Sequence, residues 1–349
     1  MNVTYLIGNG FDINLGFKTQ YKDFIKRYLE IEDKDDSAEI KRFKNDIKQD
    51  INLWSSAELA LGKYTEKFDG EKAAEEFCNC HDDFCIELAK YLVNETLSFD
   101  EKELAPIFAE DIQKYADAFR EVDRDKIIAA SQNYGQGITY NFITFNYTYT
   151  LDKLVDYSRK NLGVGQRIIQ NTRYENRIGD LIHVHGTVEK DMIMGVDNET
   201  QIANVAMFEG VGPEYRSDII KIENNRMNGE NTDSKAHELL KSSHIIYIYG
   251  MSLGETDAIW WKRICEVMKK DKNVQLIIYS HDAPSGTLIR RKRVTYDNGF
   301  RRKFTAYCDL EDEIRENIEN RISIQNNNIF INLSDVQSKN RYIPLDREG

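Results

Sequence analysis

The sequence has no long apolar run and no segment typical of a secretory leader. None of its 349 residues lies in a stretch approaching the roughly 20 apolar residues that span a bilayer, which excludes a membrane-spanning helix. The first apolar run, residues 3–7, is interrupted at once by glycine and asparagine and follows no basic segment. With 41% hydrophobic and 30% charged residues, the composition is typical of a globular protein, which we expect in the cytoplasm with no membrane partner.

Positive charge is also in deficit. The chain has 47 lysines and arginines against 59 acidic residues, a net charge of −12, so a nucleic acid would need a local basic patch to bind. The runs 290–293 and 301–303 are the basic candidates. A solvated face is the simpler interpretation, and attraction of a phosphate-rich ligand or another subunit is the alternative. We expect no nucleic-acid partner.

Cysteine is scarce and odd in number. Five cysteines without a secretory signal favour reduced thiols over a disulfide framework. Cys78, Cys80, His81 and Cys85 lie close together, but the second ligand pair of a tetrahedral zinc site is missing. We therefore expect no metal and interpret these residues as part of a helix.

The remaining pattern predicts an α/β protein with a Rossmann-like parallel sheet covered by helices. Near-continuous apolar runs alternate with helical spacings, which is typical of parallel strands buried on both faces. Strands are predicted at residues 3–7, 138–145, 181–186, 245–250, 274–279 and 303–308, with a short partner strand at 192–195. Thr19 is expected to cap the first long helix.

Three further segments complete the expected organisation. Residues 31–135 are strongly charged, contain one proline and repeat helical spacings, which predicts a helical insertion after the first β-loop-α unit. Residues 1–30 and 136–320 would then form the Rossmann domain, and 321–349 a C-terminal edge strand or tail. Residues 199–235 show no sustained pattern, which indicates a long ordered loop or lid and makes them our candidate for a gate.

Unusual residues follow four of the predicted strands. Ligands of parallel sheets bind where the carboxyl ends of the strands open onto loops. The four loops are Gly8-Asn9-Gly10-Phe11-Asp12, Thr144-Phe145-Asn146-Tyr147-Thr148, His183-Val184-His185-Gly186-Thr187 and Gly250-Met251-Ser252-Leu253-Gly254-Glu255-Thr256-Asp257.

Each loop has a structural interpretation beside the functional one. Glycines 8 and 10 suit close approach to a diphosphate, but Ile13 stands where a dinucleotide fingerprint has its third glycine, so a tight turn is nearly as plausible. Asn146 could cap a helix, and His183 could support His185, which shares its strand face. Ser252, Glu255 and Asp257 could serve only helix entry.

Taken together, these four motifs resemble the AbiH family of bacteriophage abortive-infection proteins, over residues 2 to about 310. More remotely, the glycine loop, the asparagine and the His-Gly pair resemble, in this order, the sirtuin-like NAD-binding fold. The four-cysteine zinc module of that group is missing, which disfavours protein deacetylation.

The resemblance implies a role in phage defence and a set of site residues. In the sirtuin-like layout Asn146 would hold the nicotinamide ribose or a water, and His185 would be the base, with Asp12 as a third catalytic candidate facing the ribose or the protein. Histidine has the near-neutral pKa that such chemistry needs. NAD would be the cofactor, bound as substrate or ligand, and the binding residues would be Gly8, Asn9, Gly10, Phe11, Thr144, Gly186, Gly250, Ser252, Glu255 and Asp257.

Three functions compete at this stage. The first is hydrolysis of NAD at the nicotinamide glycosidic bond, which would deplete NAD on infection. The second is an NAD or ADP-ribose sensor without turnover, in which the insertion signals to a partner. The third is a Mg²⁺-dependent nuclease that uses Asp12, Glu255 and Asp257. A phage-derived trigger, a second defence protein or a second copy of the chain are the expected partners.

Overall fold

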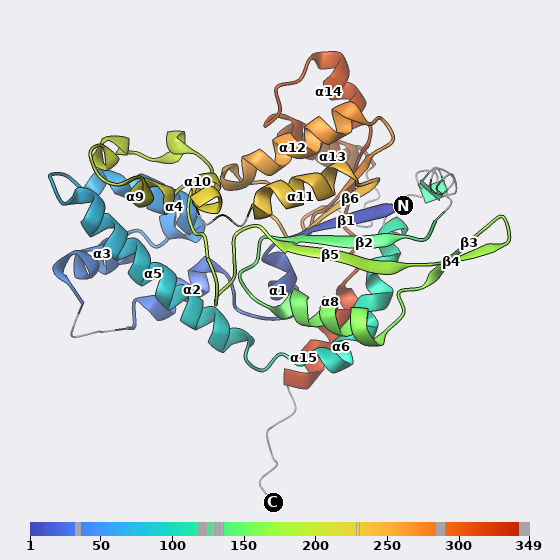
Figure 1. The fold of residues 1–349 in the computed structure, drawn as a ribbon, viewed down its shortest axis with the longest axis horizontal. Coiled ribbons are helices and arrows are strands. Elements are labelled where there is room, and N and C mark those ends of the chain that lie inside the picture. Colours follow the sequence, from blue (N-terminus) through green and yellow to red (C-terminus); the bar gives the residue numbers. More distant parts are fainter. Residues whose placement is uncertain are drawn as a thin grey trace, which may run out of the picture.

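Six parallel strands form the centre of the protein, in the order β5-β2-β1-β6-β7-β8 (Figure 1). A computed structural model describes residues 1–31, 36–117, 124–125, 127–128, 131, 134, 136–227, 229, 231–283 and 290–341. The strands are β1 (Asn2–Ile7), β2 (Thr139–Thr144), β5 (Arg177–His183), β6 (Ile245–Tyr249), β7 (Gln275–Tyr279) and β8 (Ile322–Gln325), and a separate antiparallel hairpin pairs β3 (Gln166–Ile169) with β4 (Thr172–Glu175). This architecture confirms the predicted α/β class and Rossmann-like sheet.

The central strands β1, β2, β6 and β7 are buried on both faces, as their apolar runs predict. Side chains alternate along a strand, so Val3, Tyr5 and Ile7 of β1 enter one core, while Leu6 enters another. Figure 1 shows the sheet between two helical layers. One layer contains α6 (Glu101–Asp111), α8 (Thr150–Asn161) and α15 (Ile331–Arg341), and the other contains α11 (Thr232–Lys241), α12 (Ala258–Lys270), α13 (Arg290–Thr305) and α14 (Asp312–Glu319).

A third core lies beside the sheet, at the left of Figure 1. Aromatic side chains dominate it, with Phe43, Trp54, Tyr64 and Phe84 packed ring against ring. Its helices are α2 (Tyr21–Tyr28), α3 (Ala38–Gln49), α4 (Ala57–Tyr64), α5 (Ala73–Thr96), α9 (Pro213–Ser217) and α10 (Lys221–Met227). The segment predicted as one insertion therefore packs in two places. Its helices α3, α4 and α5 belong to this third core, whereas α6 packs on the sheet with α8 and α15.

Short helices complete the secondary structure. They are α1 (Gly10–Asn14) and the 3-10 turns η1 (Leu53–Ser56), η2 (Thr65–Lys67), η3 (Ile112–Ala116), η4 (Glu199–Gln201), η5 (Val205–Phe208) and η6 (Glu255–Asp257). Residues 199–235, expected as a loop or lid, contain η4, η5, α9, α10 and the start of α11. Among the described residues no helix combines the length and the apolar character needed to cross a bilayer.

Two predicted strands are absent. Residues 303–308 are not a strand but the end of α13 and the turn after it, because Phe304 and Cys308 face the core four residues apart, a helical spacing. Residues 192–195 form no strand, and the chain there makes only an isolated bridge between Val196 and Ile220. In the segment expected as a C-terminal edge strand or tail, β8 lies at the edge of the sheet, residues 331–341 form α15, and 342–349 lie outside the described residues.

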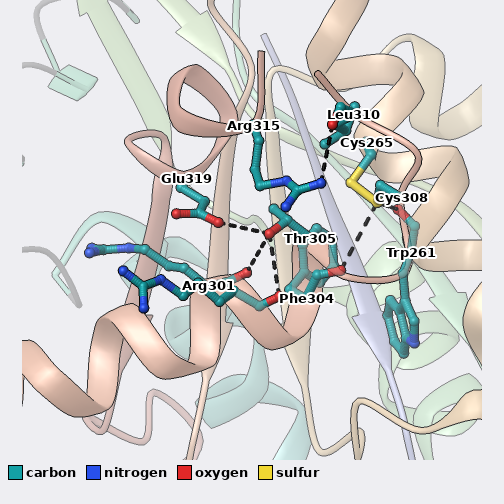
Figure 2. The surroundings of a disulfide bond; sticks show 10 residues. Trp261, Cys265, Arg301, Phe304, Thr305, Cys308, Leu310, Arg315 and Glu319 are labelled. Carbon is teal, nitrogen blue, oxygen red and sulfur yellow. Dashed lines mark hydrogen bonds between the residues drawn. A yellow bond between two sulfur atoms is a disulfide. The ribbon is translucent and has the colours of Figure 1, made fainter. Parts of the chain in front are cut away.

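The expectation of reduced thiols is wrong for one pair. Cys265 of α12 and Cys308, just after α13, form a disulfide that joins two helices of the same layer (Figure 2). The odd number of cysteines gave no sign of this pair. Cys78, Cys80 and Cys85 are free thiols on α5. Burial raises the pKa of the Cys78 and Cys80 thiols to about 12, so both stay protonated at neutral pH.

Candidate functional site

The carboxyl ends of four strands lie side by side and deliver their loops to one cavity. The register pairs Ile7 of β1 with Thr144 of β2 and Tyr249 of β6, and pairs Thr144 with His183 of β5. The cavity has a volume of about 1240 Å³ and reaches from the β5 loop across the sheet edge to the residues that follow β7 and β8. Such an edge is where parallel sheets bind ligands.

The first loop packs tightly against the loop after β6. The backbone N–H of Gly10 donates to the Gly250 carbonyl at 2.8 Å, and that of Gly8 donates to Tyr249 at 2.9 Å. A Cβ on Gly10 would lie 2.4 Å from the Gly250 Cα, and Gly250 has a φ of +69°. Both glycines are therefore required by the contact between the two loops. The donors at Gly8 and Gly10 are used within the protein.

Asn9 and Thr19 fix the far side of this loop. The Asn9 amide donates to the Thr19 carbonyl at 2.8 Å, and the Thr19 hydroxyl donates to the Asn9 side chain at 2.5 Å. Thr19 is therefore not the helix cap that the sequence predicts, since Gln20 precedes α2 as its N-cap.

Asp12 is buried and joins the first loop to the second. Its carboxylate accepts hydrogen bonds from the hydroxyls of Thr148 and Thr150. Burial raises the pKa of Asp12 to about 6, although the two hydroxyl donors and the His183 imidazole act in the opposite direction. Of the orientations expected for Asp12, the structure shows the one toward the protein.

Asn146 presents an amide without a partner. Its side chain is buried, and neither its oxygen nor its nitrogen has a hydrogen-bond partner among the described residues. The backbone is held on both sides: its N–H donates to the Thr144 hydroxyl at 3.2 Å, and its carbonyl accepts from His183 at 3.0 Å. Asp152 of α8 in turn binds the other ring nitrogen of His183 at 2.9 Å. Asn146 is not the N-cap of α8, a position that Tyr149 takes.

His185 lies in the same cavity and is also buried. Its Nε2 is 3.6 Å from the Asp257 carboxylate, and its ring meets Phe145 edge to face, with centroids 5.2 Å apart. Burial, reinforced by the Lys221 cation, holds the pKa of His185 well below its ordinary value. The imidazole is therefore neutral near pH 7, and it is a weaker proton acceptor than the near-neutral histidine that the sequence predicts.

Sequence reasoning missed two charged residues at this point. Lys221 of α10 binds Asp257 at 3.2 Å and Glu58 of α4 at 2.9 Å, and its side chain is only 5% exposed. The signal available in the sequence was a charge inside an apolar run, in Ile219-Ile220-Lys221-Ile222 and in Ala57-Glu58-Leu59-Ala60. Such a residue needs a partner when it is buried.

The predicted site residues divide into two groups. Asn146, His185 and Asp12 line the cavity, together with Gly8, Asn9, Gly10, Gly250, Ser252, Glu255 and Asp257. The three others lie behind it. Phe11 packs in the core against Phe330, Thr144 supports the Asn146 backbone, and Gly186 turns the chain after His185.

Two of the three carboxylates suggested for Mg²⁺ are engaged elsewhere. Asp12 is bound by two threonines, and Asp257 is paired with Lys221. Within the described ranges of the chain no group of three or more His, Cys, Asp or Glu side chains is arranged to hold a metal ion. The nuclease interpretation therefore gains no support from this geometry.

The fold and the cavity define an α/β protein with a Rossmann-like sheet whose strand-end loops enclose a ligand-sized site. A family model described as "Bacteriophage abortive infection AbiH" matches residues 4–279. The chain therefore belongs to the AbiH family, which implies a role in abortive infection by phage. No curated protein matches the chain in a sequence search.

Proposed function

We propose that the protein hydrolyses NAD at the bond between nicotinamide and ribose, as the chemical basis of its role in abortive infection. The observation that carries this proposal is the buried, unpartnered amide of Asn146, which lies in the wall of the same cavity as His185. Buried polar groups are nearly always paired, so an unpartnered amide in the wall of a cavity supports a ligand that hydrogen-bonds there. A ribose hydroxyl or an attacking water is such a ligand.

The dimensions of the cavity agree with a dinucleotide. Its volume of about 1240 Å³ exceeds the roughly 300–1,000 Å³ typical of small-molecule pockets. Lys22 and Lys303 also line it, so a diphosphate bound near them would meet positive charge. The amides of Gly8 and Gly10 are already used within the protein, so we do not assign a phosphate to them.

Asn146 and His185 would have separate roles in the reaction. The Asn146 amide would orient the ribose or the water, and the neutral His185 would take a proton from the water as it adds to the anomeric carbon. The glycosidic bond breaks, its electron pair leaves with nicotinamide, and ADP-ribose is the second product. One water is consumed and one proton is released.

Product analysis tests this proposal. Purified protein, alone and after exposure to lysate from phage-infected cells, is incubated with NAD, and nicotinamide and ADP-ribose are separated by chromatography. We expect both products from the wild type, and a loss of at least about 100-fold in Asn146→Ala and His185→Ala. Asn161→Ala, on the exposed end of α8, is the matched control and should retain activity. Triggered cells that die while their NAD level stays constant would contradict the proposal.

One observation favours a second function, a sensor that binds NAD or ADP-ribose without turnover. The helices beside the sheet contribute Ser55, Glu58 and Leu88 to the cavity lining, so an occupant would touch the segment that could signal to a partner. Isothermal titration separates the two functions. Saturable binding of NAD with no product under any triggering condition would favour the sensor.

A further inference from the structure

Four titratable side chains from four separate segments meet at one side of the cavity. Glu58 comes from α4, His185 from the loop after β5, Lys221 from α10 and Asp257 from the loop after β6. Glu58, His185 and Asp257 line the cavity, whereas Lys221 lies behind them. The cluster therefore connects the helices beside the sheet to the candidate base.

The side-chain ammonium of Lys221 makes three hydrogen bonds. Its ammonium donates to Glu58 Oε2 at 2.9 Å, to the Thr256 carbonyl at 3.0 Å and to Asp257 Oδ1 at 3.2 Å. An ammonium has three donors, and all three are used. Burial opposes the charge, but Asp257 and Glu58 outweigh it and raise the pKa of Lys221, so the buried cation persists at neutral pH.

The Asp257 oxygen that binds Lys221 also faces the imidazole. Asp257 Oδ1 lies 3.2 Å from the Lys221 Nζ and 3.6 Å from the His185 Nε2. One carboxylate oxygen thus lies between the cation and the ring. Without the cation, nothing among the contacts described would hold Asp257 at that point, because its side chain makes no capping hydrogen bond to α12.

We infer that Lys221 is a positioning residue for His185: it fixes Asp257 against the imidazole and uses Glu58 as its second anchor. This inference rests on the proposed function and deepens it. The base would be assembled only when α4, α10 and the loop after β6 are docked together. Displacement of α4 or α10 would release Asp257 and disable the site without touching the sheet.

The charged groups around His185 determine how its pKa responds when one of them is removed. Asp257 and Lys221 are its nearest charged neighbours, Glu58 lies behind Lys221, and Asp197 interacts with both Lys221 and Asp257. The phenols of Tyr21 and Tyr147 also lie near Asp257, and burial raises their pKa, so they stay neutral. Removing Lys221 takes away the cation of this group and leaves the carboxylates.

The test is an NMR titration of the His185 imidazole, assigned with His185→Ala, in the wild type, Lys221→Met and Lys221→Arg. We expect Lys221→Met to raise the pKa of His185 by about one unit or more, because the cation that opposes protonation of the ring is removed. Lys221→Arg should restore most of the wild-type value, and the exposed Lys235→Met should leave it unchanged. If the single Met variant fails to fold, Glu58→Gln/Lys221→Met removes the cation without leaving Glu58 unpaired.

Kinetics supply the second readout. If NAD is turned over, Lys221→Met should lower kcat by about tenfold or more with KM within about twofold, since the base is misplaced while the ligand contacts remain. An unchanged His185 titration in a folded Lys221 variant would overturn the inference. That result does not depend on turnover, so it is distinct from failure of the proposed function, in which no variant or wild type forms nicotinamide.

Discussion

The Asp12 carboxylate accepts a hydrogen bond of 2.6 Å from the hydroxyl of Thr148, a residue 136 positions further along the chain. Thr150 donates to the other carboxylate oxygen. These bonds tie the loop after β1 to the loop after β2, which carries Asn146. The buried Asp12 carboxylate therefore links two loops of the cavity. Its ionisation consequently changes the free energy of unfolding.

Replacing Asp12 should reveal this coupling as a pH dependence of stability. The folded pKa is about 6 and the ordinary value is 3.8, so between these pH values the folded protein keeps a proton that the unfolded chain has lost. The contribution of Asp12 to stability is then largest at low pH and falls as pH rises toward 6. Asp12→Asn does not titrate. Its unfolding free energy relative to the wild type should rise by about 2 kcal/mol between pH 4.5 and 7.5.

Urea denaturation at the two pH values measures this difference. Asp69→Asn, at an exposed position, is the matched control and should show no such change with pH. A relative stability of Asp12→Asn that is the same at both pH values would show that the carboxyl is not destabilised by burial.

Gly10→Ala should force apart the loops after β1 and β6. The new methyl group would lie 2.4 Å from the Gly250 Cα and 2.9 Å from the Gly250 carbonyl oxygen, and backbone cannot rotate away as a side chain can. We expect a loss of about 1–3 kcal/mol in unfolding free energy, measured in urea, and weaker NAD binding. In Gly299→Ala, on α13, the Cβ meets open space, and this control should gain about 0.5–1 kcal/mol. Equal effects of the two substitutions would contradict the steric explanation.

Removing the unpartnered amide of Asn146 should abolish the stabilisation by NAD without lowering the stability of the fold. Asn146→Ala eliminates a buried polar group without a protein partner, a group whose burial costs about 1–3 kcal/mol. We expect a melting temperature equal to or above that of the wild type, together with loss of the stabilisation that added NAD gives. Thermal unfolding with and without NAD measures both. A marked drop in melting temperature would mean that Asn146 holds the fold rather than a ligand.

Counting the free thiols tests whether the disulfide is formed. Denatured protein treated with iodoacetamide without reductant should carry three labels, on Cys78, Cys80 and Cys85, and five labels after reduction. The bridge closes a loop with a sequence separation of 43 residues, so its loss in Cys265→Ala/Cys308→Ala should lower the unfolding free energy by about 2–4 kcal/mol. Mass spectrometry gives the count. Five labels in the unreduced protein would show that the pair is a dithiol.

The sheet and the position of the cavity were predictable because they depend on local patterns. Each strand is a short apolar run, and parallel pairing aligns the strand ends, so the loops carrying Asn146 and His185 had to reach the same edge. The end of α13 was predicted as a strand for the same local reason, since a short run such as residues 303–308 fits either period when it is read alone.

Contacts between segments that lie far apart in the sequence could not be predicted from local patterns. Lys221 and Glu58 are 163 residues apart, and only the docking of α4 against α10 brings them together. The glycines at 8 and 10 suit both a phosphate and a close backbone contact, and only the position of Gly250 shows which contact the fold requires. The Cys265–Cys308 pair likewise depends on how two helices of one layer are packed.

The residue just before the last described helix supports the first loop of the site. Phe330, just before α15, packs against Phe11 of the first loop, with ring centroids 5.3 Å apart, and against Tyr249 at 4.9 Å. A growing chain has no complete support beneath that loop until translation has passed Phe330. The loop that is synthesised first therefore depends for its packing on a residue that is synthesised much later.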